Sequence, residues 1–301
     1  MVILIEHVYK KVLTADVVSK DSGTISVDLG DKGGISALFL RLSATNGAGG
    51  SATYGLRAAI SEIRVKTGKG DVPFRLSAND AYALATLRDG IAPELSEGTG
   101  GGAVQAVRIP VCFGINREDT DHGLDLVNCA GATLEIDYAI TVSGADGFVT
   151  KSLTLDVDAL ETRGKVKPVY KGCLRTAIAG LHTTAVKDPH VVELKGSKNL
   201  IGLHAYAYLA GTADNALVSN IRLIRAGENE PMIDAGFSDL QYRHPTLAGS
   251  IVTSYATVWK APGRDGNRSL IAEIAPELRV ELKELVAAGA ARLIGEWIGA
   301  A

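Results

Sequence analysis

Residues 60–65 read Ile-Ser-Glu-Ile-Arg-Val, and residues 218–223 read Val-Ser-Asn-Ile-Arg-Leu. Serine, isoleucine and arginine occupy the same positions in the two segments. A proline lies ten residues after the isoleucine that the two segments share, at Pro73 after Ile63 and at Pro231 after Ile221. This agreement predicts that the chain folds one β-rich domain and then repeats it.

The correspondence extends outward from these two segments on both sides. Upstream, Leu38–Leu40 matches Leu203–Ala205, and downstream Leu134–Ile136 matches Leu278–Val280. Most of the sequence alternates with the period of two that is typical of strands, and Gly-, Asn- and Asp-rich turns separate the strands. Each half then contains about eight strands, which is the number in a jelly roll. We predict an all-β chain of two tandem eight-stranded jelly-roll sandwiches, with a few short helices in loops.

The alternation stops between the two halves. Residues 161–168 are polar and contain Gly164 and Pro168, both of which interrupt regular structure. We therefore predict an N-terminal jelly roll over residues 1–160, a linker over 161–168 and a C-terminal jelly roll over 169–301.

Each half is predicted to end in a hairpin. Leu134–Ile140 alternates without a break, and Leu153–Val157 is its expected partner strand after a turn at 143–147. The second half has its candidate turn at 287–291. Residues 282–298 also fit an amphipathic helix, and of the two interpretations we favour the hairpin.

Several local features predict where strands, helices and loops begin. Pro110 lies in an apolar segment, so that strand should run along a sheet edge or start after the proline. Ser77 is a candidate N-cap for a short helix. The glycine-rich stretches Asn46–Gly55 and Arg88–Ala103 are expected to be exposed loops, and we expect them to shape the outer surface.

The composition is that of an ordinary globular protein of 301 residues with a formal net charge of −3. Without a run of Lys or Arg, direct binding of nucleic acid is not expected. The three cysteines form no CxxC pair, so we expect free thiols in a reducing cytoplasm. We expect neither a signal peptide nor a membrane-spanning helix, because no basic segment precedes the apolar Met1–Leu4 and no run of about 18 apolar residues occurs.

Sequence motifs for catalysis are absent. No nucleophile elbow, zinc-protease helix or phosphate-binding loop occurs, and His204, in an apolar strand, is predicted to be a structural histidine. The best metal candidate is an acidic loop in which Asp119, Asp121 and Asp125 surround a glycine, because carboxylate oxygens suit calcium. The terminal glutamate of a calcium loop is missing, so an acidic turn between strands is the interpretation we favour and calcium the alternative.

The order of these strand patterns resembles the major capsid proteins of tailless phages with an internal membrane, of the corticovirus type, within the double jelly-roll lineage. The resemblance covers nearly the whole chain, and the second half starts the plan again at Leu174. The segments that carry it are Gly23–Leu29, Ile60–Val65 with the turn Gly68–Pro73, Ile109–Gly114 and Leu134–Ile136.

The resemblance implies a structural role and no enzymatic activity. Three copies would form a pseudo-hexameric capsomer that tiles an icosahedral shell over a lipid vesicle, next to other capsomers and a penton or minor capsid protein. The chain would be assembled in the host cytoplasm and reside in the virion capsid. Two alternatives stay open: a carbohydrate- or receptor-binding β-sandwich protein, such as a virion spike or lectin, and a glycosidase on a β scaffold.

Overall fold

The structure, a computed structural model, forms two compact units, Met1–Leu174 and Arg175–Gly299. The residues it describes are 5–50, 55–89, 92–115, 119–140, 147–164, 170–183, 190–195, 200–209, 212–213, 217–225, 229–242, 255–259, 277–283 and 289–299.

The boundary between the units lies later in the chain than the predicted linker 161–168. Strand β10 (Thr154–Gly164) occupies the first four of those residues, because Glu161 and Thr162 are buried and pair with neighbouring strands. The rest of the predicted linker lies outside the described residues. Residues 170–174 belong to the first unit, so the N-terminal domain extends past the predicted end at 160.

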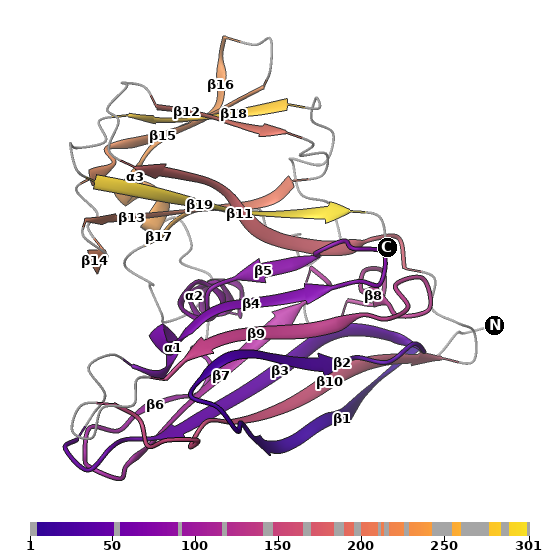
Figure 1. The fold of residues 1–301 in the computed structure, drawn as a ribbon. Helices are drawn as coiled ribbons and strands as arrows, with labels where there is room; N and C mark the ends of the chain where they lie inside the picture. The colour runs from indigo at the N-terminus through magenta and orange to yellow at the C-terminus, as the bar shows by residue number, and fades with distance from the viewer. Residues whose placement is uncertain are drawn as a thin grey trace. The chain divides into compact units, whose positions relative to one another are not determined.

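The first unit is a sandwich of two antiparallel sheets (Figure 1). One sheet has the order β1 (Ile5–Val17), β10, β3 (Gly34–Thr45), β7 (Val104–Cys112) and β6 (Leu95–Glu97), and β8 (Leu124–Asp125) pairs with β3. The other has the order β2 (Ser22–Asp28), β9 (Thr133–Ala139), β4 (Ile60–Lys66) and β5 (Phe74–Leu76).

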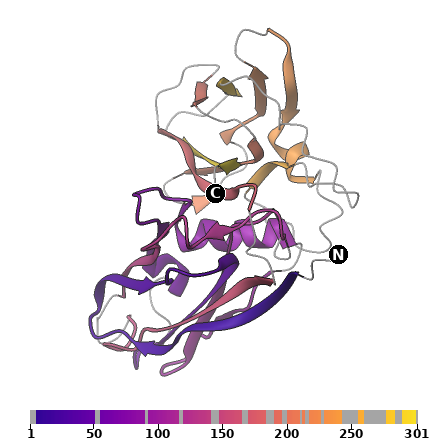
Figure 2. The ribbon, with the colours of Figure 1, turned by 90° about the vertical axis from the view of Figure 1, so that its right-hand side faces the viewer.

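Alternation places the core of the first unit between these sheets. Leu38, Leu40 and Leu42 of β3 are fully buried and face one way, as the period of two requires. Two helices close the sandwich, α1 (Leu56–Ala59) and α2 (Ala78–Asp89), and α2 contacts β4 and β7, one strand from each sheet (Figure 2). The predicted N-cap is confirmed, because Ser77 Oγ accepts a hydrogen bond from the Asp80 amide at 3.2 Å.

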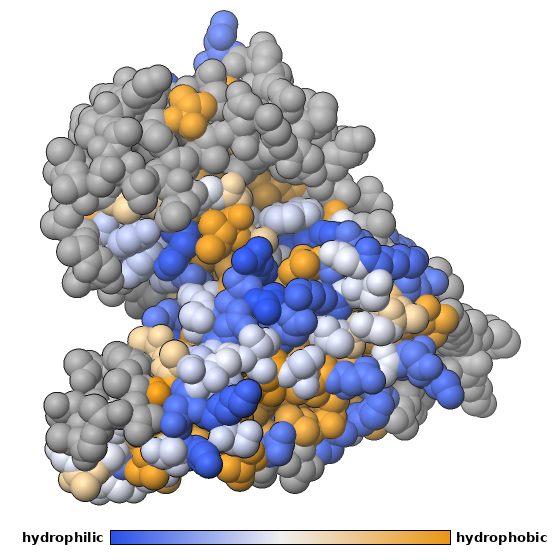
Figure 3. Space-filling view, viewed as in Figure 1, coloured by the Kyte–Doolittle hydropathy of each residue, from blue (hydrophilic) through white to orange (hydrophobic). Residues whose placement is uncertain are grey.

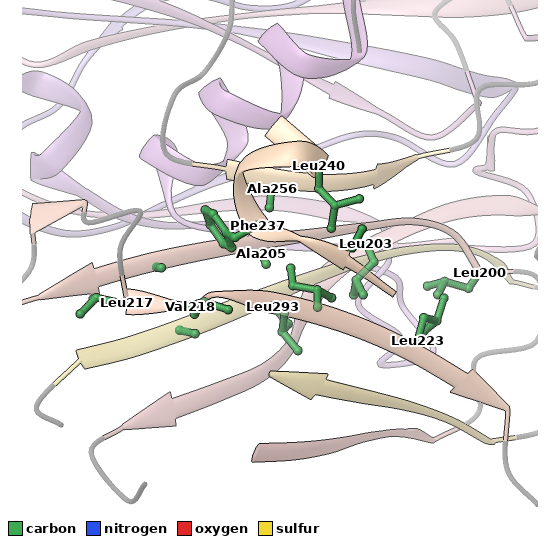
Figure 4. Packing of buried hydrophobic residues seen from close by; sticks show 14 residues of the cluster. Leu200, Leu203, Ala205, Leu217, Val218, Leu223, Phe237, Leu240, Ala256 and Leu293 are labelled. Atoms are coloured by element: carbon green, nitrogen blue, oxygen red, sulfur yellow. The ribbon is translucent and has the colours of Figure 1, made fainter. Parts of the chain in front are cut away.

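The second unit repeats this architecture (Figure 1). One sheet has the order β11 (Cys173–Thr183), β19 (Gly289–Gly299) and β13 (Leu200–Leu209), and both β17 (Tyr255–Trp259) and β14 (Thr212–Ala213) pair with β13. The other has the order β12 (His190–Lys195), β18 (Glu277–Lys283), β15 (Asn220–Arg225) and β16 (Pro231–Gly236), which leads into α3 (Phe237–Tyr242). Leu203, Leu223, Leu293 and Phe237 of α3 belong to one buried apolar cluster in the core of this unit, in which Figure 4 shows Leu223 beside Leu200 and Phe237 near Ala205.

Eight strands of each unit occur in the same order. The sheet β1-β10-β3-β7 corresponds to β11-β19-β13-β17, and the sheet β2-β9-β4-β5 corresponds to β12-β18-β15-β16. A helix follows the fourth strand of the second sheet in both units, α2 after β5 and α3 after β16. The predicted fold of two tandem jelly rolls is confirmed.

Strand pairing corrects one detail of the repeat. Arg64 pairs in register with Glu135, whereas the equivalent Arg222 pairs in register with Glu281. The predicted match of 134–136 with 278–280 therefore joins the correct strands, β9 and β18, but is two residues out of register. A shift of two preserves which side chains face the core, so alternation alone could not reveal it.

Both predicted hairpins are wrong as pairings. β9 and β10 lie in different sheets of the first unit, and β18 and β19 lie in different sheets of the second. Each connection crosses between sheets, since β10 pairs with β3 and β19 pairs with β13. The alternative of a helix over residues 282–298 is also wrong, since 277–283 and 289–299 are strands.

Pro110 shows how a proline fits inside a sheet. β7 runs through Pro110 and pairs with β3 along its whole length, so the strand does not start after the proline. On its other side, the Arg108 amide donates to the Glu94 carbonyl at 2.9 Å, and β6 pairs only up to Val107. The nitrogen of Pro110, two residues on, points to that same side, where no described strand continues. The predicted edge position is therefore confirmed locally.

Candidate functional site

The acidic loop predicted as a metal candidate is organised by hydrogen bonds to protein groups. Asp119 accepts from the amides of Ile115 at 2.9 Å, Asp121 at 2.8 Å and His122 at 3.1 Å, and its Oδ2 lies 2.9 Å from His122 Nδ1. Burial would raise the pKa of Asp119, but these donors outweigh it and hold the pKa below its ordinary value. Asp119 thus acts as the anchor of a turn.

The other two aspartates face different partners. Asp121 is exposed and pairs with Lys171 at 2.7 Å. Asp125 is buried in β8, and it accepts from the amides of Val127 and Asn128 and from Asn128 Nδ2 at 2.8 Å. Each of the three carboxylates therefore already binds donors of the chain.

The described part of the chain holds no group of three or more His, Cys, Asp or Glu side chains placed to hold a metal ion. The three carboxylates fit the acidic turn that the sequence favoured. The calcium alternative stays a prediction, and residues 116–118 of this loop lie outside the described ranges.

The loop also fixes the segment that leads out of the first unit. The Gly123 amide donates to the Gly172 carbonyl at 3.0 Å, and the Lys171 amide donates to the Asp121 carbonyl at 2.7 Å. Tyr170 is buried with its ring against Gly34 and Gly123, where a side chain would overlap it. The glycines at these two positions let the ring approach the backbone closely.

A buried pair of amide side chains orders the glycine-rich stretches at one end of the first unit. Asn46 is fully buried, and its Nδ2 donates to the carbonyls of Gly98 at 2.7 Å and Gly100 at 3.2 Å. Its Oδ1 accepts from Gln105 Nε2 at 2.9 Å, and Gln105 Oε1 in turn accepts from the Leu56 amide at 2.9 Å.

This cluster corrects the prediction of a loose loop over residues 88–103. The start of that stretch is the end of α2, and residues 95–97 form β6, whose pairing with β7 gives the backbone regular hydrogen bonds. The turn that follows is held by Asn46 rather than by an apolar core. Residues 51–54 and 90–91 lie outside the described ranges.

Charged side chains form a paired network on the outer face of β4 and β9, where Figure 3 shows hydrophilic residues gathered. Arg64 bonds Glu62 at 2.6 Å, Glu135 at 2.5 Å and Asp137 at 2.5 Å, and Lys66 bonds Glu135 at 2.7 Å. The Lys66 ammonium, with Arg64, lowers the pKa of Glu135. Arg75 also bonds Glu62, at 2.9 Å, so three cations face three carboxylates and this network offers no net field to a charged ligand.

His204 is buried in β13 of the second unit, as its prediction as a structural histidine requires. Its Nε2 lies 3.0 Å from Glu296 Oε2, and Thr176 Oγ1 donates to Glu296 Oε1 at 3.4 Å. The three residues come from adjacent strands of one sheet, β13, β19 and β11. No short-range pattern could have paired residues 92 positions apart.

All three cysteines are buried, and the structure places none of them in a disulfide. Within the described ranges, no helix has both the length and the apolar character needed to cross a bilayer.

Comparisons with known proteins find matches in structure and none in sequence. No protein-family model and no curated protein matches the chain. The major capsid protein of STIV superposes with a TM-score of 0.73 over 97% of this chain and 97% of its own, at 8% identity. The major capsid protein P2 of bacteriophage PM2 gives a TM-score of 0.63 over 98% of both chains at 12% identity. The Faustovirus major capsid protein gives 0.59 over 99% of this chain and 90% of its own at 7% identity.

The chain has a double jelly-roll fold. These superpositions cover both jelly rolls, in agreement with the strand order of the two units. Insertions account for little of either chain, since at least 90% of each neighbour is matched. At identities of 7–12%, the likeness is one of fold and not of sequence.

Proposed function

We propose that this chain is a viral major capsid protein. The observation that carries the proposal is the end-to-end structural match, over 97% of both chains, with a protein described as a major capsid protein. The duplication supports it, because a subunit with two similar domains in series can present similar contact surfaces to neighbours on two sides. A capsid subunit also needs a rigid scaffold, and the sheets of both units supply one through continuous strand pairing.

Three copies of the chain would supply six jelly rolls to one capsomer. Most soluble oligomers have closed point-group symmetry, and a heterologous contact closes into a ring when its rotation permits. We propose a homotrimeric, pseudo-hexameric capsomer that packs against other capsomers and a penton or minor capsid protein in an icosahedral shell. The shell would enclose a lipid membrane, and assembly would occur in the host cytoplasm.

The functional surface in this proposal is the contact between copies and not a catalytic centre. We expect no enzymatic activity and no direct contact with nucleic acid, and at the 119–125 loop we favour an acidic turn, with calcium binding as the alternative. The Asn46–Gln105 cluster and the Arg64 network support the role of a scaffold, because both consolidate the fold through bonds between distant segments.

Size-exclusion chromatography with light scattering tests the proposal. A species near three times the monomer mass of 31.5 kDa, or larger bodies built from it, is expected at micromolar concentration. A strict monomer that binds glycans on an array would contradict it and would support the carbohydrate-binding alternative.

A further inference from the structure

The outermost strand of the first unit has the properties of a docking edge. β1 is 13 residues long, about twice the usual strand length, and among the described residues it pairs only with β10 (Figure 1). Its other edge carries a row of backbone donors and acceptors with none of the described strands beside them. Natural proteins protect such an edge by shortening it or by proline, bulges and lysines, because an open edge invites another strand. The later part of β1 has two register shifts, after Lys11 and after Leu13, whereas Ile5–Lys11 contains no proline or glycine and runs in unbroken register with β10.

An exposed aromatic side chain lies on this strand. Tyr9 is 69% exposed, the highest value among the exposed large hydrophobic residues of the described chain, and its ring lies 5.7 Å from that of Phe39. Val17, at the end of the same strand, is 59% exposed. Tyrosines that project from a surface in this way are enriched among residues that dominate binding energy.

The charges beside Tyr9 favour a protein as the partner. Lys10 pairs with Glu161 at 2.7 Å, and Lys11 lies 3.2 Å from both Asp156 and Asp158. Each ammonium group is paired with a carboxylate, so β1 is not the dense, unpaired basic surface that nucleic acid phosphates or anionic lipid favour. The side chains of Lys10 and Lys11 are still 48% and 44% exposed, so they can meet an isolated carboxylate of a protein partner.

The chain itself contains an edge of suitable length and charge. β16 is the outermost strand of its sheet in the second unit, and it pairs only with β15 among the described residues. Residues 228–236 contain the acids Glu228, Glu230 and Asp234 and no base, whereas residues 5–13 contain two lysines and one acid. Asp234 already pairs with Arg222 at 2.6 Å, so the attraction to the lysines of β1 depends mainly on Glu230. Glu230 is exposed at the start of this strand.

We propose that the free edge of β1 in one copy docks against the β16 edge of a second copy of this chain. The contact joins different surfaces of the two copies, so it is heterologous and leaves one free edge of each kind for the next copy. Such a contact extends a chain of copies until it closes into a ring. The inference rests on the proposed function, since it names the surfaces through which the capsomer would form.

Hydrogen–deuterium exchange on the full chain tests the docking, together with light scattering over a dilution series. Amides of Ile5–Lys11 that do not bond β10 are expected to become protected in the oligomer, together with amides of β16. Tyr9→Ser should raise the concentration of half-association by about tenfold or more. Glu230→Lys should also raise the concentration of half-association, and by the largest factor at low salt. Val104→Ser, which removes another exposed apolar side chain of the same unit at 54% exposure, should change it by less than about twofold.

The outcomes separate the two proposals. Oligomers whose β1 and β16 amides exchange as in the dilute protein, or whose formation is unaffected by Tyr9→Ser, overturn the docking edge and leave the capsid proposal standing. A chain that stays monomeric at every concentration overturns both. Thermal unfolding of each variant shows whether a loss of association reflects the surface or a loss of folding.

Discussion

Gln105 Nε2 donates a 2.9 Å hydrogen bond to Asn46 Oδ1 in the interior of the first unit, across 59 residues of sequence. Both side chains are at most 2% exposed. Through this bond β3 and β7 are connected to the turn that carries Gly98 and Gly100, because Asn46 Nδ2 donates to both of their carbonyls. A buried polar pair of this kind stabilises the fold only when each of its donors and acceptors has a hydrogen-bond partner.

Replacing Asn46 should therefore destabilise the first unit. Asn46→Ala leaves the amide of Gln105 and two turn carbonyls without their partner, so we expect a loss of about 2 kcal/mol in the free energy of unfolding. Urea denaturation followed by circular dichroism measures it. Ser61→Ala removes only one exposed 3.3 Å hydrogen bond and should change stability by less than about 0.5 kcal/mol. Equal losses in the two variants would show that the cluster has no special role.

The network around Arg64 predicts a pH dependence of stability. The pKa of Glu135 is lowered by Lys66 and Arg64, and the pKa of Asp137 is also lowered, because hydrogen bonds from Thr24 and Arg64 outweigh its burial. A carboxyl group with a lowered pKa in the folded state stabilises the protein above its unfolded pKa, and this contribution is lost as the pH falls through the folded value. The wild type should therefore lose stability as the pH falls below about 4.

The variant Arg64→Met isolates this contribution. We expect it to cost about 1–2 kcal/mol at pH 7, and the difference from wild type should shrink at pH 3, where the carboxyl groups become protonated. Arg41→Met is the matched control, because Arg41 is half exposed and its ion pair with Glu94 is long, at 3.6 Å. A deficit of Arg64→Met that is the same at both pH values would mean that packing, not charge, explains it.

The close approach of Tyr170 to Gly34 predicts a steric effect. A methyl group at Gly34 would overlap the ring of Tyr170, so Gly34→Ala should lower the free energy of unfolding by about 2–3 kcal/mol. Gly100→Ala meets nothing within 4 Å and should be nearly neutral. Combining Gly34→Ala with Tyr170→Ala should cost less than the sum of the single changes. Strict additivity in that thermal-unfolding cycle would exclude the contact.

Calcium should leave the 119–125 loop unchanged. Because Asp119 and Asp125 already accept several hydrogen bonds each from the chain, a cation would have to displace these donors. We expect the melting temperature to be the same, within error, in calcium and in chelator. A rise with calcium that Asp119→Asn abolishes would support the calcium alternative.

The repeat was the part of the fold most accessible from sequence. Residues 60–65 and 218–223 form β4 and β15, which occupy the same place in the two units, and alternation identified most core faces. Alternation specifies which side chains are buried but not which strand lies alongside. For this reason alternation predicts β9 as the partner of β10, whereas β10 pairs with β3. It also matches β9 with β18 in a register that is two residues away from the observed one.

The polar clusters were not predictable in the same way. Asn46 and Gln105 look like ordinary loop and strand residues, and their bond depends on β3 and β7 being paired in one sheet. The glycines at 98–102 predict a loose exposed loop, because glycine loses much conformational entropy when it is ordered. The sequence does not show the hydrogen bonds from Asn46 that offset this cost. One signal was available, since the arginine shared by the two repeats forms an ion pair in both units, Arg64 with Glu135 and Arg222 with Asp234.

Electron cryomicroscopy of the purified, assembled chain addresses the proposed role most directly. Three copies should form one ring of six jelly rolls, with β1 of each copy beside β16 of the next. A monomer at high concentration, or an assembly whose repeating unit does not contain six such domains, would contradict the capsid role.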